Sequence, residues 1–290
     1  MLHAVFAGRR PSESSKVRVQ KLLRGGLRQR GMQDGLPEGS RTPPELFLVV
    51  VSLVGTCPGW RARCTSLETM DKGNRISRFG MVNAYLAREY DGLTLIDTML
   101  GGSTETIVEG AEALGVPIAR IVLTHAHGDH VGSLDALKAR LPEAEVIISA
   151  RDARLLKKDM TLDPNEPKDK LRGGYPGAAT RPDRTVEGGD RIGSLEVIFT
   201  PGHTPGHISL LDTRDRTVYC GDVYSTLGGA ATSARFNPVF PLALFTWHRP
   251  TELESARALR ALEPARLAPG HGKVLDDPLE AMDRAIARAS

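Results

Sequence analysis

The sequence predicts an α+β fold in which β-sheets pack on each other and helices cover their outer sides. Short apolar strand patterns alternate with amphipathic helix patterns in two halves, roughly residues 79–158 and 186–290. In both halves, residues of metal-ligand type follow apolar strands, where loops meet over a rigid scaffold. With 290 residues, of which 40% are hydrophobic, the chain can bury a substantial core.

Residues 1–69 are expected to form a poorly structured extension or to reflect a misassigned start. They hold 11 Lys+Arg against 5 Asp+Glu, whereas residues 70–290 hold 27 and 30. The apolar run 46–55 has the size of a signal-peptide core but begins more than 40 residues into the chain. We therefore expect a start near Met70 and a cytoplasmic protein. The alternative is a secreted protein that starts at Met32.

Three further features bound the class of protein. No apolar run reaches the roughly 20 residues of a membrane span. The three cysteines, Cys57, Cys64 and Cys220, are too few and too widely spaced for a disulfide framework, which favours a reducing compartment. No basic field marks residues 70–290, so nucleic acid is not an expected partner.

The first half contains four strand patterns and three helix patterns. Asp91-Gly92 predicts a hairpin turn, and Ser103 with Glu105 predicts a capping-box start for the first helix. The strands are expected at 81–86, 93–97, 119–123 and 145–149, and the helices at 103–114, 130–141 and 151–158.

Residues 159–185 lose this periodicity and are rich in Asp, Pro, Lys, Arg and Gly. Insertions of this length in compact domains are commonly functional lids or mobile segments, although a solvated connector fits the composition too. Strand patterns return at 195–200, 207–211, 217–221 and 266–268, and helix patterns at 251–262 and 279–289.

The densest polar motif is Thr124-His125-Ala126-His127-Gly128-Asp129-His130, directly after an apolar run. Imidazole and carboxylate are ligands that borderline divalent metals accept readily. His125 and His127 share one face of an extended segment, and the turn at Gly128 directs Asp129 and His130 toward a second point. This one segment can therefore supply ligands to two neighbouring metal ions.

Four more polar residues lie at strand ends elsewhere in the chain. They are His203 in a Pro-Gly-His turn, Asp222 after Cys220-Gly221, His271 in Pro-Gly-His-Gly, and Asp97 after Leu95-Ile96. In this order and spacing, the motifs resemble the metallo-β-lactamase-fold hydrolase superfamily over about residues 75–275. The resemblance implies an αββα sandwich of two mixed sheets with a dinuclear metal site in a cleft at one edge.

The resemblance also implies a role for each motif residue. His125, His127 and His203 would bind the first metal. Asp129, His130 and His271 would bind the second, and Asp222 would bridge both. Asp97 would lie behind the ligands, where it could accept an imidazole N–H; the alternative is a plain turn residue.

Two divalent ions held in this way would lower the pKa of a bridging water, since one zinc ion alone brings it to about 7. The resulting hydroxide would attack a carbonyl that the metals polarise, and Asp129 would orient this nucleophile as the catalytic residue. Histidine and carboxylate ligands without thiolate fit Zn²⁺ best, and also suit Fe or Mn.

Several neighbouring residues receive other roles. Cys220 is two residues before Asp222 and would share its face of a strand; we predict a buried small apolar residue. His207 is predicted to pack or hydrogen-bond and not to bind metal. The loop after Asp222, which also carries Phe240 and Phe245, is expected to wall a substrate pocket, with core packing as the alternative. The side chains expected to line this pocket are Tyr224, Phe236, Trp247 and His248.

The favoured function is hydrolysis of a small ester, lactone or thioester. Lactone and ester hydrolases of this fold have about this length and keep the bridging aspartate, which true β-lactamases lack. Glyoxalase-II-type thioesterases add a helical C-terminal extension, whereas 19 residues follow His271 here. The alternatives are a mononuclear-iron persulfide dioxygenase, a β-lactamase-like amide hydrolase and a non-catalytic binding module. We expect a small-molecule substrate and no membrane partner; the oligomeric state, a homodimer included, is open.

Overall fold

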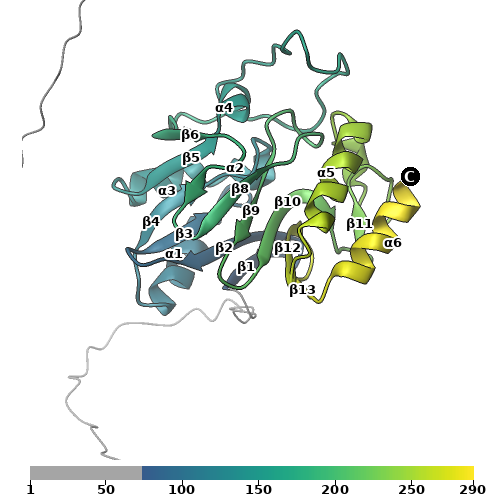
Figure 1. The fold of residues 1–290 in the computed structure, drawn as a ribbon. Helices are drawn as coiled ribbons and strands as arrows, with labels where there is room; N and C mark the ends of the chain where they lie inside the picture. The colour runs from purple at the N-terminus through teal and green to yellow at the C-terminus, as the bar shows by residue number, and fades with distance from the viewer. Residues whose placement is uncertain (1–73) are drawn as a thin grey trace, which may run out of the picture. The chain divides into compact units, whose positions relative to one another are not determined.

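The computed structural model describes residues 74–290, so the expected extension 1–69, the apolar run 46–55, and Cys57 and Cys64 lie outside the described residues. Within 74–290, no helix is long and apolar enough to span a membrane. The strands of this described part form one mixed sheet of 13 strands, whose central path runs β6-β5-β4-β3-β2-β12-β10-β9-β8-β7 (Figure 1).

The strands of the first half of the sheet are β1 (Arg75–Arg78), β2 (Val82–Arg88), β3 (Leu93–Ile96), β4 (Ile118–Val122), β5 (Glu145–Ser149) and β6 (Arg184–Val186). Those of the second half are β7 (Arg191–Ile192), β8 (Leu195–Phe199), β9 (Ile208–Asp212), β10 (Thr217–Ser225), β11 (Ala231–Thr232), β12 (Arg266–His271) and β13 (Leu275–Asp276). The helices are α1 (Thr104–Ala113), α2 (Gly128–Val131), α3 (Leu134–Arg140), α4 (Ala150–Leu156), α5 (Arg249–Ala261) and α6 (Leu279–Ala289), with a 3₁₀ turn η2 (Leu242–Leu244).

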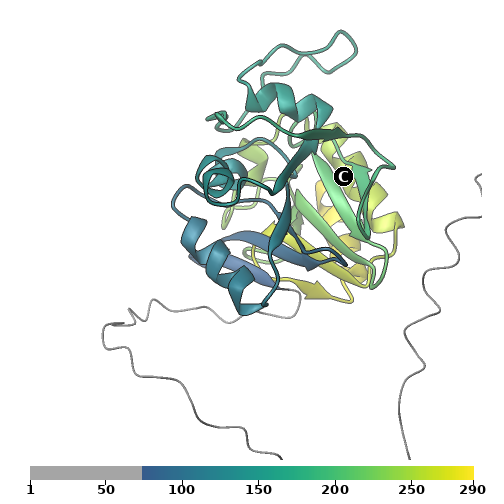
Figure 2. The same ribbon diagram turned by 90° about the vertical axis from the view of Figure 1, so that its left-hand side faces the viewer.

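Alternation along the strands divides the core into layers, because successive side chains point to opposite faces. In β4, Ile121 belongs to the apolar cluster that includes α1 and α3 residues, whereas Val122 belongs to the cluster between the two halves of the sheet. In β12, Leu267 packs with residues of α5 and α6, whereas Ala268 faces the middle cluster. The order of layers is therefore helix, sheet, sheet, helix (Figures 1 and 2), as predicted.

The two halves are joined by a short seam. β2 and β12 pair antiparallel through Val82 and His271, so the sheet curls continuously from one half to the other. The first half runs mainly parallel, with β3, β4, β5 and β6 side by side, which places the carboxyl ends of several strands at one edge. That edge is where loops can bring polar side chains together.

Two expectations for the helices were wrong. The capping box at α1 does not form, because the Ser103 hydroxyl donates to Leu100 O at 2.8 Å and makes no cap bond; Glu105 also follows it by two residues where the box needs three. The helix expected at 130–141 is split into α2 and α3. Between them, Gly132 N donates to Met99 O and His130 O accepts from Thr98 N, so the loop after β3 takes backbone groups that a continuous helix would use.

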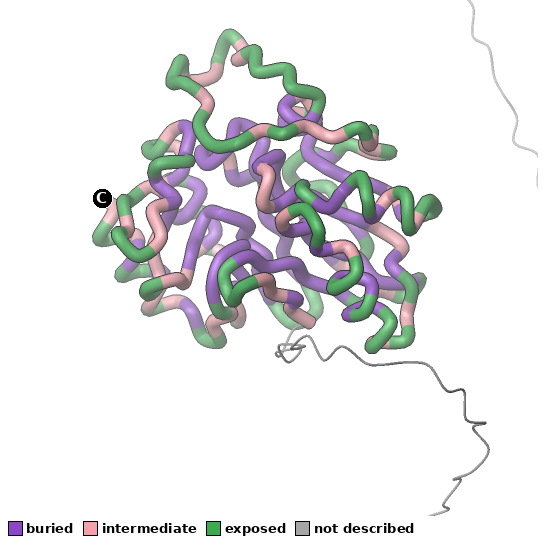
Figure 3. Tube along the Cα trace, turned by 180° about the vertical axis from the view of Figure 1, so that it is seen from behind, coloured by how far each residue is buried: buried purple, intermediate pink, exposed green. Residues whose placement is uncertain are grey.

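The segment between α4 and β6 contains neither helix nor strand, in agreement with the irregular insertion predicted there. We name residues 157–183 the strap. None of its residues is buried, and Figure 3 shows it as a tube of exposed and intermediate residues that runs along the top of the buried segments.

Candidate metal centre

Seven side chains from both halves of the sheet converge at one edge. The segment after β4 and the short helix α2 provide four of them, and the turn between β8 and β9, strand β10 and the end of β12 provide one each. All are buried except Asp129, whose side chain is one-third exposed. The seven residues are His125, His127, Asp129, His130, His203, Asp222 and His271, the set predicted from the motifs.

Asp222 lies at the centre of this cluster. Its Oδ1 is 3.3 Å from His130 Nε2, and its Oδ2 is 3.2 Å from His203 Nε2 and 3.3 Å from His271 Nε2. His125 Nε2 lies slightly farther away, at 3.9 Å from Oδ2. The carboxylate thus faces imidazoles from both predicted half-sites.

The potential ligand atoms form three overlapping groups, each within 4.8 Å. One contains His125, His127 and His203, and another contains Asp129, His130 and His271, as expected from the sequence. A third group, which joins His125 to His130 and Asp222, was not anticipated and lies between the other two.

The outer ring nitrogens of two histidines meet acceptors that determine their tautomers. His127 Nε2 is 2.9 Å from Arg172 O, which can only accept, so the proton is on Nε2 and the Nδ1 lone pair faces inward. His203 Nδ1 is 3.1 Å from Thr246 Oγ1, whose own proton goes to Ser233 O. His203 therefore donates through Nδ1 and directs Nε2 into the cluster.

The other three imidazoles are held in the same way. His130 Nδ1 donates to Asp97 Oδ2 at 2.8 Å, and His271 Nδ1 donates to the carbonyl of Met81 at 3.0 Å. His125 Nδ1 lies 3.0 Å from Thr124 Oγ1, which donates onward to Asp97 Oδ2. Asp97 therefore lies behind two imidazoles and orients both.

The inner atoms of these groups have no hydrogen-bond partner, although they are buried. They are His125 Nε2, His130 Nε2, His271 Nε2 and Asp222 Oδ1. Buried polar atoms are rarely left unpaired, because each costs ~1–3 kcal/mol. Imidazole nitrogens and carboxylate oxygens that face one another without a partner are the donor types of a divalent cation, so the residues fit metal ions of this type.

The protonation states agree with this donor set for the histidines that lie farther from the carboxylates. Burial holds the pKa of His125 well below its usual value and lowers the pKa of His127 to about 3, so both rings are neutral. Burial opposes the charging of His271 too, but the nearby Asp222 and Asp129 carboxylates raise its pKa to about 9. A bound cation would have to displace the proton from such a ring.

Two residues near the cluster have the roles expected of them. Cys220 is buried in the apolar cluster with α5 and α6. His207 accepts from Asp222 N through Nε2 at 3.1 Å, and its Nδ1 bonds to Thr200 Oγ1. Since both ring nitrogens are engaged, His207 has no lone pair left for a metal.

The expectation that Cys220 and Asp222 share a strand face was wrong. Gly221 has φ +49° and interrupts the register of β10 against β12, so Cys220 points to the core and Asp222 to the cluster. A Cβ at Gly221 would lie 2.5 Å from His207 Nε2, so glycine is required there both for the conformation and for the space.

Sequence reasoning missed Asp152 in the first turn of α4. Its Oδ2 accepts from Ala126 N at 2.9 Å and from Thr204 Oγ1 at 2.8 Å, and its Oδ1 accepts from Gly206 N at 2.8 Å. Burial raises the pKa of Asp152 to about 6, so the group is ionised at neutral pH. This carboxylate ties the loop of His125 and His127 to the loop of His203. Its place just after β5 is the same strand-end signal that identified the ligands.

Glu252 in α5 was missed as well. It is fully buried, and burial raises its pKa to about 8, so it carries a proton at neutral pH. Its backbone packs against Gly202, the residue before His203.

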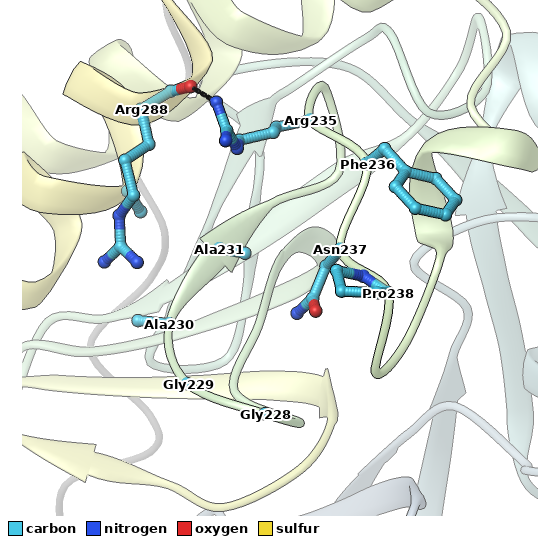
Figure 4. Close-up of a pocket in the computed structure, with 10 residues that line it drawn as sticks. Gly228, Gly229, Ala230, Ala231, Arg235, Phe236, Asn237, Pro238 and Arg288 are labelled. Carbon is cyan, nitrogen blue, oxygen red and sulfur yellow. Dashed lines mark hydrogen bonds between the residues drawn. The ribbon is translucent and has the colours of Figure 1, made fainter.

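A cleft of about 730 Å³ opens beside the cluster, but the four predicted wall residues do not line it. Tyr224 lies in the core and donates to Ala256 O, and Trp247 is buried and donates through Nε1 to Asp169 O. His248 caps α5 by accepting from Thr251 N. Phe236 lines a different pocket, together with Arg235 and Arg288 (Figure 4).

The same loop does contribute aromatic residues to the cleft, at other positions. Phe240 and Phe245 line it, and the Phe240 ring is 4.6 Å from that of His271. The strap contributes another part of the lining, through residues 173–176. The cleft is lined by Leu100, Gly101, His127, Gly128, Asp129, Gly132, Gly173, Gly174, Tyr175, Pro176, His203, Asp222, Phe240, Leu242 and Phe245.

Comparison with known proteins places this geometry in a family. A family model described as the metallo-beta-lactamase superfamily matches residues 77–271. The uncharacterized protein YobT of Bacillus subtilis (strain 168) is 46% identical over 210 residues, which are 72% of this chain and 90% of that protein.

Other relatives match less of their own length or are more distant. The hydroxyacylglutathione hydrolase of Rhodospirillum rubrum is 37% identical over 128 residues, so the match spans 43% of this chain and 41% of that enzyme. Among solved structures, TTHA1623 in a di-iron-bound form is 29% identical with a TM-score of 0.51, covering 69% of this chain and 92% of that one. The B3 metallo-beta-lactamase BLEG-1 is 26% identical with a TM-score of 0.52, covering 70% and 91%.

Proposed function

We propose that this chain, which belongs to the metallo-β-lactamase superfamily, is a dinuclear metal-dependent hydrolase of a small, uncharged ester, lactone or thioester. The observation that carries the proposal is the set of buried inner atoms with no hydrogen-bond partner: His125 Nε2, His130 Nε2, His271 Nε2 and Asp222 Oδ1. The outer nitrogens of the three rings are already held, so the inner atoms are left to bind cations.

The two groups of donors support two ions. His125, His127 and His203 would hold one, and Asp129, His130 and His271 the other, with Asp222 between them. Zn²⁺ is the proposed ion because the donors are imidazole and carboxylate without thiolate; iron suits the same donors, and the similar TTHA1623 is described as di-iron-bound. Divalent ions at such a site supply Lewis acidity, which activates water and polarises a carbonyl.

The protein's own contribution is to position the reactants. Asp129 lines the cleft and is the partly exposed carboxylate of the cluster, and its Oδ2 lies 3.3 Å from His271 Nε2. Although burial opposes ionisation, His130 and His271 hold the pKa of Asp129 well below its usual range, so it accepts hydrogen bonds at neutral pH. Asp129 can thus orient a water molecule toward a carbonyl carbon bound in the cleft.

The lining of the cleft narrows the substrate. Beyond the donor cluster, its walls are glycines and the apolar or aromatic residues Leu100, Tyr175, Pro176, Phe240, Leu242 and Phe245. None of the described residues that line it is Lys or Arg, so nothing there would pair with the carboxylates of a glutathione thioester. This lining favours an uncharged acyl or lactone substrate over hydroxyacylglutathione.

The test is metal analysis followed by a substrate panel. We expect about two metal ions per chain and metal-dependent turnover of an apolar ester or lactone, with His125→Ala losing at least ~100-fold in kcat/KM because an ion ligand is gone. His248→Asn is the matched control, since His248 lies outside the cluster and Asn can keep the helix cap.

Other results would assign a different activity. One iron per chain with oxygen consumption in the presence of a persulfide would identify the dioxygenase reaction. Turnover confined to a β-lactam would identify an amide hydrolase. No metal-dependent turnover of any ester, lactone or thioester in the panel would refute the proposal.

A further inference from the structure

The strap, residues 157–183, has no fully buried residue (Figure 3), yet its Arg172 O contacts the ring of His127 in the cluster. Its residues 173–176 form one wall of the cleft. Away from the site, the strap forms ion pairs such as Arg151 with Glu166, and its Leu171, Tyr175 and Ala178 pack partly buried against an apolar cluster. Because none of its residues is fully buried, the strap can detach without opening the core. Its contacts with the site indicate what it does there.

The strap hydrogen-bonds to two consecutive residues of the segment that carries His125 to His130. Arg172 O accepts from His127 Nε2 at 2.9 Å, and Gly174 O accepts from Gly128 N at 3.0 Å. The Tyr175 ring lies 4.7 Å from the His127 ring. Among the described residues, Arg172 O is the acceptor that gives His127 the tautomer in which Nδ1 faces the cluster.

At Gly173, the strap backbone lies so close to the His127 ring that no side chain fits between them. It has φ +87°, and a Cβ there would lie 2.3 Å from His127 Nε2. The next residue differs: a Cβ at Gly174 would meet nothing within 4 Å, and its φ is not positive. Two adjacent glycines thus differ in whether a methyl group would push the strap off the imidazole.

A second anchor links the strap to another ligand of the same group. Trp247 Nε1 donates to Asp169 O at 3.0 Å, and Trp247 N donates to His203 O at 3.1 Å. One buried tryptophan therefore bonds to the strap with its side chain and to His203 with its backbone. The strap is connected in this way to both His127 and His203.

We propose that the strap positions the three-histidine group, which consists of His125, His127 and His203. Binding of a metal ion by His127 and His203 and ordering of the strap then favour each other. The inference rests on the proposed metal centre. The coupling is reciprocal: a seated strap holds His127 in the binding tautomer, and a bound ion holds His127 where the strap docks. Because the strap is also a cleft wall, metal loading completes the substrate site.

The first experiment uses the wild-type chain alone. Protein freed of metal by a chelator is treated with trypsin with and without Zn²⁺, and cleavage is followed after the exposed Lys170. We expect Zn²⁺ to slow this cleavage several-fold, since cleavage requires the strap to detach. Equal cleavage rates in protein that has bound two Zn²⁺ ions would overturn the inference.

The second experiment compares adjacent glycines by titration of metal-free protein with Zn²⁺. Gly173→Ala should weaken one of two Zn²⁺ sites by ~10–100-fold, as loss of an outer partner of a ligand does, and should abolish the protection of Lys170. Gly174→Ala should keep wild-type affinity and protection. Wild-type affinity at both sites in Gly173→Ala would refute the proposal. If Gly173→Ala does not fold, the wild-type protection decides.

The two proposals fail in different ways. A wild-type chain that binds no Zn²⁺ and no iron contradicts the proposed metal centre itself. A chain that binds two ions and hydrolyses an ester, but whose strap is cleaved equally in both states, contradicts only the coupling.

Discussion

Replacing Asp152 should separate the two loops that carry the three-histidine group. The Asp152 carboxylate accepts from two backbone N–H groups, of Ala126 and Gly206, and from the hydroxyl of Thr204. Asp152→Ala leaves these donors buried without that acceptor. Each unpaired buried donor costs ~1–3 kcal/mol, and the Thr204 hydroxyl can turn elsewhere, so we expect a loss of about 4 kcal/mol in the free energy of unfolding.

The assay is urea denaturation of metal-free protein, which separates folding from metal binding. The matched control is Asp159→Ala, because Asp159 is exposed and bonds to exposed groups; its removal should cost less than ~1 kcal/mol. Zn²⁺ titration gives a second readout. The hydrogen bonds of Asp152 go to Ala126, Thr204 and Gly206 and not to a cluster side chain, so a weaker Zn²⁺ site in Asp152→Ala would indicate a change in the spacing of the loops.

A free energy of unfolding for Asp152→Ala within ~1 kcal/mol of that for Asp159→Ala would refute the reasoning. It would mean that the donors find other partners and that the loops are held together without Asp152. Asp152→Asn should lie between the two, because its amide keeps one acceptor oxygen but turns an NH₂ group toward a donor.

Two more substitutions test buried carboxyl groups. Asp97→Asn should lower Zn²⁺ affinity by ~10–100-fold in a chelator competition, because Asp97 orients both His125 and His130, and unchanged affinity would contradict that role. Burial raises the pKa of Glu252 from 4.5 to about 8, so the proton it holds stabilises the folded state fully below pH ~4.5, and this contribution is lost as the pH rises through 8. Glu252→Gln has no such proton to lose. Its free energy of unfolding relative to that of wild type should therefore rise by a few kcal/mol between pH 5 and pH 9, at ~1.4 kcal/mol per pKa unit. An equal difference between the two proteins at both pH values would argue against a buried neutral acid.

The layer order and the seven cluster residues followed from the sequence because their signals are local. His125 to His130 lie in one short segment, and Asp222 and His271 follow apolar strands, so each could be recognised from its immediate neighbours. The strand at 145–149 and the helix at 279–289 coincide with β5 and α6, since their periodicity and boundaries are clear.

The substrate wall could not be predicted in the same way. Which aromatic of the loop after Asp222 reaches the cleft depends on how that loop folds back, and alternation along β10 is broken at Gly221. Tyr224 and Trp247 entered the core, whereas Phe240 and Phe245 line the cleft. The acceptors behind the histidines include the carbonyl oxygens of Arg172 and Met81, which every residue type carries. Residue identity gives no signal for such contacts.

The seam between β2 and β12 has a consequence for how the site comes into existence. His271 is both a member of the cluster and the residue that pairs with Val82 across the seam, and its ring donates to Met81 O. Residues before the strap supply four of the seven cluster side chains and residues after it supply three. Neither portion of the chain holds a complete donor set. Pairing of β2 with β12 therefore also completes the donor set, which makes metal affinity a measure of whether the two portions have docked in register.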